Sequence, residues 1–224
     1  YIWQTGIAYN KQIFEERGIP EPEGWEILWD PRVAGHVAIP DITVAMGPYT
    51  IVGVAMTQGG DDHNIQPGID KLASINPEIY PSSSVLETMF SNGDIWVASW
   101  IDGRAGSMLD KGQPIEFAKP KFESFVGMAG TDTIDIVKGT KERELAHILI
   151  NEFLSKESQK IFALGTNYST SHIEAASEIK AEGKGKHFWV FSPEEAAAAY
   201  KIDWKHVNSV LPQWTDLWNK TFKR

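Results

Sequence analysis

The chain has 224 residues, of which 42% are hydrophobic and 11% aromatic, and its formal net charge is -9. This composition excludes a disordered chain, and the length suffices for one large or two small folded domains. The acidic residues are spread along the chain without a basic stripe, which argues against binding to nucleic acid. Cys is absent, which excludes disulfides and Cys-ligated metals.

The first half of the sequence predicts strands alternating with helices. Aromatic and β-branched residues predict a strand over 1–10, and the short helix that follows ends at Gly18. The elements expected next are a helical turn at 25–29, a strand at 36–41, a helix from 46 to 59, a helix at 67–75, a strand near 78–83, a helix at 84–93 and a strand at 94–101. This alternation indicates a layered α/β domain.

The second half predicts extended segments followed mainly by helices. In chain order we expect extended segments at 114–122 and 125–139, an amphipathic helix at 140–165, a flexible linker at 181–187 and helices to the end. Ser192 followed by Pro193 predicts a helix N-terminus. The sequence begins at Tyr1, inside the first expected strand and without Met or a leader, so we expect this chain to be a fragment.

Catalytic and metal-binding motifs are not found in the sequence. The six His residues are scattered without the spacing of metal ligands, so we expect no bound metal. Asp132 and Asp135 lie three residues apart in an extended segment, where their side chains point to opposite faces and cannot share a proton. We expect no enzyme and no cofactor; a hydrolase that uses Asp132 or His172 is the alternative.

The segment "SWIDGRAGSM", residues 99–108, carries the strongest candidate residues. Trp100, Asp102 and Arg104 lie at the end of an expected strand, and open α/β sheets bind ligands beyond the carboxyl ends of their strands. The alternatives are that Trp100 is a core residue and that Arg104 is a surface cation paired with Asp102 or Asp110.

Several segments, in this order and spacing, resemble the extracellular (periplasmic) solute-binding proteins of ABC importers, in the spermidine/putrescine-binding branch. They are "TGIAYNKQ", "GWEILWDPRVAGHVAIPD", "MFSNGDIWVASWIDGRA", "IDIVKGTKERELAHILINEFLSKESQKIFA" and "WTDLWNK". The resemblance implies a binding protein in the periplasm, or outside the cell with a lipid anchor. Its partners would be a small-molecule solute and a membrane permease; a sensor role uses the same fold.

The fold implied by this resemblance is α/β, of the type II periplasmic-binding-protein kind, with two lobes that close around a ligand. Such a chain would contain one complete lobe and part of the second. The expected divisions are a first hinge strand at 1–10, the second lobe at 11–124, a returning hinge strand at 125–137, part of the first lobe at 138–180, and C-terminal helices on the second lobe at 181–224. Self-association could replace the missing N-terminal lobe.

The resemblance also assigns ligand contacts. Trp100 matches an aromatic residue that stacks on the ligand, and Asp132 matches an acidic residue that pairs with the ligand's amine. Ile42 and Ala45 stand where polyamine binders have acidic residues, and Gly130 stands where they have Trp.

These departures favour a zwitterionic, amino-acid-like ligand over a polyamine, which is the alternative. Arg104 could bind the ligand's carboxylate through its guanidinium fork, with Asp102 orienting Arg104. The expected helix start at Gly47 could direct backbone N–H groups at the same carboxylate. Thr43 and Thr131 complete the candidate set.

Overall fold

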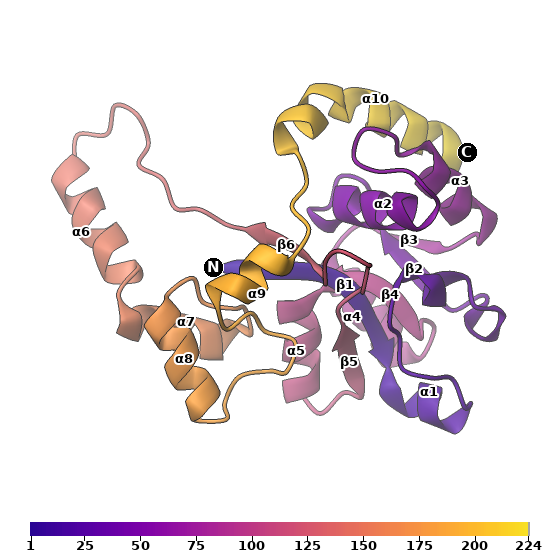
Figure 1. Ribbon diagram of the computed structural model, residues 1–224, viewed down its shortest axis with the longest axis horizontal. Coiled ribbons are helices and arrows are strands. Elements are labelled where there is room, and N and C mark those ends of the chain that lie inside the picture. Colours follow the sequence, from indigo (N-terminus) through magenta and orange to yellow (C-terminus); the bar gives the residue numbers. More distant parts are fainter. Residues whose placement is uncertain (224) are drawn as a thin grey trace.

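One six-stranded mixed sheet forms the centre of the molecule (Figure 1), as seen in a computed structural model that describes residues 1–223. The strands are β1 (Ile2–Asn10), β2 (Val37–Pro40), β3 (Glu78–Tyr80), β4 (Val97–Ile101), β5 (Ile115–Ala118) and β6 (Met128–Thr131). Their order is β3-β2-β4-β1-β5, with β6 also beside β1. β2 is parallel to β3 and β4, whereas β1 is antiparallel to β4, β5 and β6. The predicted α/β architecture is confirmed.

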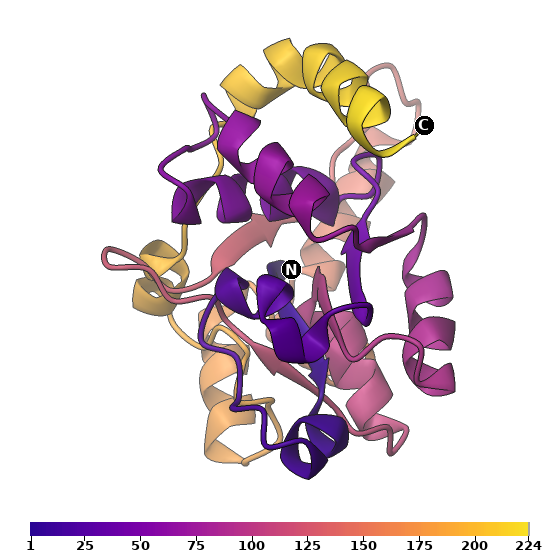
Figure 2. The same cartoon turned by 90° about the vertical axis from the view of Figure 1, so that its right-hand side faces the viewer.

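Helices connect and cover the strands. The α-helices are α1 (Lys11–Glu16), α2 (Met46–Thr57), α3 (Gln66–Ser74), α4 (Ser83–Asn92), α5 (Asp102–Asp110), α6 (Arg143–Phe153), α7 (Lys156–Thr166), α8 (Ile173–Ala181), α9 (Pro193–Ala198) and α10 (Trp204–Phe222). Two short 3-10 helices are η1 (Trp25–Trp29) and η2 (Pro31–Val33). In both views α10 lies over the layer formed by α2 and α3 (Figures 1 and 2).

The two faces of the sheet are covered by different helices. In β4, the Ser99 hydroxyl is 2.6 Å from the Thr50 hydroxyl of α2. Side chains alternate along a strand, so the next residue, Trp100, points to the other face, where its ring lies 5.9 Å from that of Phe90 in α4. The sheet is therefore buried between α2 and α4, and β4 runs through the core.

Caps set the ends of several helices. The Asn10 side chain accepts a hydrogen bond from the Ile13 amide (3.1 Å) at the start of α1, and α4 ends at Gly93, whose φ of 80° is left-handed. The Ser192 hydroxyl accepts from the Glu195 amide (3.2 Å), so the N-terminus of α9 lies where the sequence predicts it.

Three elements differ from the prediction. The single helix expected at 140–165 is two helices, because the hydroxyl of Ser155 accepts from the Ser158 amide and caps α7 as a new helix. The extended segment expected at 125–139 is a strand only at Met128–Thr131. The helix α5, which begins directly after β4, is an element that the sequence analysis did not predict.

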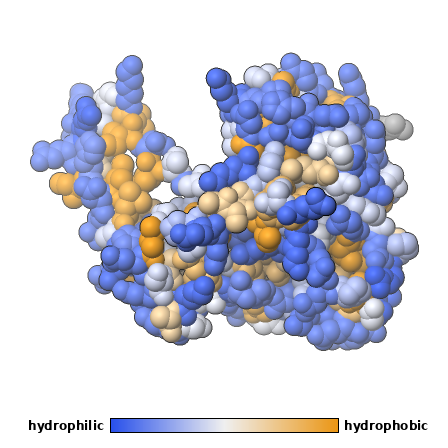
Figure 3. Space-filling model, in the orientation of Figure 1, coloured by the Kyte–Doolittle hydropathy of each residue, from blue (hydrophilic) through white to orange (hydrophobic). Residues whose placement is uncertain are grey.

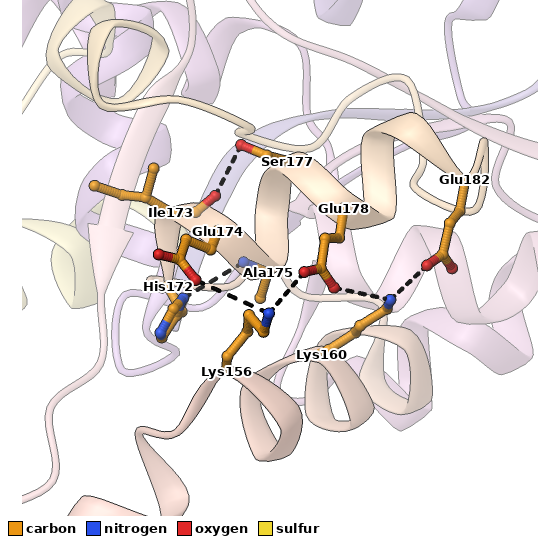
Figure 4. Close-up of polar contacts among 9 residues, drawn as sticks. All are labelled: Lys156, Lys160, His172, Ile173, Glu174, Ala175, Ser177, Glu178 and Glu182. Carbon is orange, nitrogen blue, oxygen red and sulfur yellow. Dashed lines mark hydrogen bonds and ion pairs between the residues drawn. The ribbon is translucent and has the colours of Figure 1, made fainter.

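Ion pairs hold α8 against α7 (Figure 4). Lys156 lies 2.8 Å from Glu178, and Lys160 lies 3.2 Å from the other oxygen of the same carboxylate. Lys160 also pairs with Glu182, and Lys156 with Glu174. Exposed ion pairs contribute little individually, so this network mainly fixes how the two helices align.

The helix α6 stands apart from the sheet and has no buried residue (Figure 1). Leu145, Ile148 and Leu149 follow a helical spacing on one side and are each about 60% exposed, at 61%, 59% and 63%. Figure 3 shows apolar surface over this part of the molecule. The apolar stripe of α6 is therefore uncovered in this chain.

Candidate functional site

The parallel strands end at one edge of the sheet, where three helices begin. β2, β3 and β4 run in the same direction, and α2, α4 and α5 start after their carboxyl ends. The N-terminal end of β1 lies at this edge too, because Thr5 pairs with Ile101. We call this region the strand-end edge; it is where α/β sheets bind ligands.

Asp132 follows β6 at the strand-end edge and is held in place on one side. Its backbone amide donates to the Tyr1 carbonyl (3.1 Å), and its Oδ1 accepts from the Trp3 indole (3.2 Å). The residue is exposed, so its carboxylate remains open to solvent. Burial, with a contribution from the Asp132 carboxylate, raises the pKa of the nearby Tyr1 hydroxyl. Asp132 is thus an exposed, oriented negative charge.

Arg104 lies in the first turn of α5, with its side chain 51% exposed. One guanidinium nitrogen, Nη1, is 3.6 Å from Oε1 of Glu87 in α4. Burial raises the pKa of the Tyr168 hydroxyl, and the neighbouring Arg104 opposes this rise. The ring of Tyr168 lies 4.8 Å from that of Tyr1.

The two predicted charged residues therefore come together around one pair of aromatic rings. On one side, the Asp132 amide donates to the Tyr1 carbonyl; on the other, the Tyr168 ring packs against Gly103, the residue before Arg104. A negative and a positive charge on either end of a small aromatic surface can bind a molecule that carries an ammonium and a carboxylate.

Trp100 does not contribute to this surface, contrary to expectation. Its side chain is fully buried, and its indole donates to the Ser83 hydroxyl (3.1 Å). The strand β4 does end here, as the sequence predicts. Side chains alternate between the two faces along β4, however, and the Trp100 ring points into the core beneath α4. The alternative interpretation of Trp100 as a core residue is the one that the structure supports.

Asp102 does not orient Arg104, so that prediction is also wrong. Its side chain is fully buried, and its Oδ1 accepts from the Gly103 amide (2.7 Å). Within residues 1–223, Oδ2 has no hydrogen-bond partner. Burial raises the pKa of Asp102 to about 7. The carboxylate beside Arg104 is instead that of Glu87.

Gly47 does not offer a free amide, because its N–H donates to the Val44 carbonyl (2.7 Å). A Cβ at this position would lie 2.6 Å from the Asp41 carbonyl oxygen, so close packing explains the glycine. The Thr43 hydroxyl donates to the Asp41 carboxylate (2.7 Å), and Thr43 is exposed. Thr131 is exposed at the end of β6. Both threonines lie at the strand-end edge and stay candidate contacts.

Gly130, which replaces an expected Trp, faces Trp3 on the neighbouring strand. The two residues are paired in the β1–β6 register, and a Cβ on Gly130 would lie 2.3 Å from the Trp3 ring. The indole of Trp3 therefore fills the space above Gly130. An aromatic ring is present beside Asp132 after all, but it comes from the opposite strand.

Other aromatic residues extend this surface and were missed in the sequence. The Tyr49 ring of α2 packs edge-on against Trp3 (5.0 Å), and its hydroxyl accepts from the Trp204 indole (3.1 Å). The only available signals were the abundance of Trp and Tyr and the position of Tyr49 just inside a predicted helix. Neither signal shows that Tyr49, Trp3 and Trp204, which are far apart in the sequence, lie together in the fold.

Other kinds of site are not found at this edge. Residues 1–223 contain no group of three or more His, Asp or Glu side chains that could hold a metal ion. In the same residues, no helix has the length and apolar character to cross a bilayer.

A groove of about 520 Å³ lies along β5, between Tyr9, Glu21, Glu116 and Phe188. None of the candidate residues lines this groove, so we place the site on chemical grounds at the open strand-end edge.

Comparison with known proteins shows the family of the chain. Residues 1–195 match the family described as bacterial extracellular solute-binding protein. The spermidine/putrescine-binding periplasmic protein 1 of Haemophilus influenzae is 26% identical over 184 residues, which cover 79% of this chain and 48% of that protein. The chain thus spans about half the length of this curated relative.

Solved structures show the same fold. An ABC transporter structure from Clostridium perfringens has a TM-score of 0.75 and 32% identity, covering 99% of this chain and 67% of that one. A spermidine/putrescine ABC transporter substrate-binding protein from Streptococcus pneumoniae has a TM-score of 0.72 and 20% identity, covering 97% of this chain and 68% of the other.

Proposed function

Because the chain belongs to the bacterial extracellular solute-binding proteins, we propose that it is the substrate-binding component of an ABC importer for a small, amine-containing solute. The observation that carries this proposal is that Asp132 and Arg104 lie on either side of the packed Tyr1 and Tyr168 rings at the strand-end edge. A zwitterionic, amino-acid-like solute is favoured.

Asp132 supports binding of an amine. Its carboxylate is exposed, its orientation is fixed by the Trp3 indole, and the Tyr49 ring packs against that indole. An alkylammonium gains from a carboxylate partner and from nearby aromatic faces.

Arg104 supports a carboxylate at the other end of the solute. A diamine would gain nothing from a guanidinium in its site, whereas a carboxylate can bind to it in a bidentate manner. Polyamine binding is the second candidate, and the observation in its favour is the 26% identity to the spermidine/putrescine-binding relative.

The proposal includes partners and location. The solute would pass to a membrane permease, and the protein would act in the periplasm or outside the cell. The division into hinge strands and lobes at 1–10, 11–124, 125–137, 138–180 and 181–224 belongs to the same proposal. Self-association of the chain in place of the missing N-terminal lobe belongs to it as well.

An enzymatic role has less support. His172, the residue considered for a hydrolase, accepts a hydrogen bond from the Ala175 amide (3.4 Å) and caps α8. Asp132 is bonded to an indole and not to a base. Neither residue forms the nucleophile and base pair that hydrolysis needs.

Calorimetric titration with 4-aminobutyrate and with putrescine tests the proposal, on this chain and on a version extended to the full length of its relatives. The two molecules have the same four-carbon spacing and differ in one terminal group. Binding of 4-aminobutyrate alone supports a zwitterion site. If putrescine alone binds, this is a polyamine site and Arg104 is a surface residue. If neither molecule binds, the amine proposal is wrong.

A further inference from the structure

The guanidinium of Arg104 already has an anionic neighbour in the chain itself. Glu87 lies in α4, which begins at the same strand-end edge as α5, and its side chain is 24% exposed. It is the only acidic residue of this helix. Within residues 1–223, Arg104 is the one cation within ion-pair distance of its carboxylate.

The contact between Glu87 and Arg104 is loose. Nη1 and Oε1 are 3.6 Å apart, and within residues 1–223 no hydrogen bond joins the two side chains. Ion pairs that water reaches contribute little free energy, because water screens the charges. Another carboxylate could therefore displace Glu87 from Arg104.

We propose that Glu87 is a built-in counterion that competes with the carboxylate of the solute for Arg104 and thereby sets the preference of the site between zwitterions and cations. This inference rests on the proposed function of the site. Neither the resemblance nor the expected contacts include Glu87.

The charge of the site explains the competition. With Glu87 beside it, the guanidinium already has an anionic partner, and the carboxylate of Asp132 lies open to the ammonium of a solute. A zwitterion must displace Glu87 before its carboxylate reaches Arg104. A diamine meets no such obstacle, and its second ammonium gains from Glu87.

Glu87→Gln separates these two effects, because the amide keeps the shape of the side chain and loses its charge. Given the small free energy of such pairs, we expect the variant to bind 4-aminobutyrate about two- to fivefold more tightly and putrescine about two- to fivefold more weakly. Glu16→Gln, on the exposed side of α1, removes the same charge far from the site and is the matched control. Calorimetry of all three proteins measures both affinities.

Equal affinities in wild-type protein and Glu87→Gln would overturn the inference while leaving the proposed function intact. A parallel change of both affinities in one direction would overturn it too, since competition requires opposite changes.

A second measurement does not depend on solute binding. In a nitrogen-15 NMR titration with acetate, the side-chain Nε–H signal of Arg104 should respond at about two- to fivefold lower acetate concentration in Glu87→Gln than in wild-type protein. Identical acetate responses would refute the competition even if neither solute binds, and loss of solute binding alone would refute the proposed function. Matching thermal unfolding of the variants shows that each is folded.

Discussion

The buried carboxyl group of Asp102 gives a prediction that can be worked out in detail. It is fully buried at the start of α5, one oxygen has no partner within residues 1–223, and burial raises its pKa from 3.8 to about 7. At ~1.4 kcal/mol for each pKa unit, this difference corresponds to about 4 kcal/mol.

The sign follows from proton binding. The folded chain keeps the proton on Asp102 up to about pH 7, whereas the unfolded chain loses it near pH 4. The contribution of this group to stability is therefore present below about pH 4 and is lost as the pH rises through about 7.

Asp102→Asn keeps the acceptor for the Gly103 amide and cannot become charged. We expect its free energy of unfolding, relative to wild-type protein, to increase by about 4 kcal/mol between about pH 4 and pH 8. Urea unfolding followed by Trp fluorescence measures this difference. The other carboxyl groups contribute equally to the free energies of both proteins, so their contributions cancel. Asp216→Asn, at an exposed position, controls for the lost charge. A pH-independent difference for Asp102→Asn would refute the assignment of a buried, protonated carboxyl group.

Three further predictions concern the site and the uncovered helix. Arg104→Ala should weaken 4-aminobutyrate binding about tenfold or more, through loss of charged hydrogen bonds, and unchanged affinity in calorimetry would remove Arg104 from the site. Gly130→Ala should lower the free energy of unfolding by about 1 to 3 kcal/mol because its Cβ would meet the Trp3 ring. A free energy of unfolding in urea equal to that of the wild-type protein would contradict this. We expect the protein to self-associate through the exposed stripe of α6 and Leu149→Glu to reduce this association; light scattering that finds the wild-type protein monomeric, or the variant equally associated, would contradict the prediction.

The sequence predicts most strands and helices because their patterns are local. α5 is one exception: Asp102, Gly103 and Gly106 all disfavour a helix interior or suggest a turn. In the folded chain these glycines allow close packing, since a Cβ on Gly103 would lie 2.4 Å from the Tyr168 ring. The helix thus depends on a contact with a residue 65 positions away (168 − 103), which no local pattern contains.

Only part of the candidate site was predicted, because its contacts also join residues that no local pattern connects. The end of β4 located Arg104, and the resemblance located Asp132, yet neither showed which way each side chain points. Trp100 required the pairing of its strand and the position of α4 before its face could be assigned. Glu87 and Arg104 lie on different helices, with β4 between them in the sequence, and Glu87 carries no motif, so only the packing of α4 and α5 brings the two together.

The pairing of Trp3 with Gly130 ties the two positions together. They share one volume, because the Trp3 indole occupies the space that a Cβ on Gly130 would enter. A larger side chain at position 130 would therefore need a smaller one at position 3. Residues that shape this side of the Asp132 carboxylate are best changed in pairs, one on each strand, because a single substitution moves both.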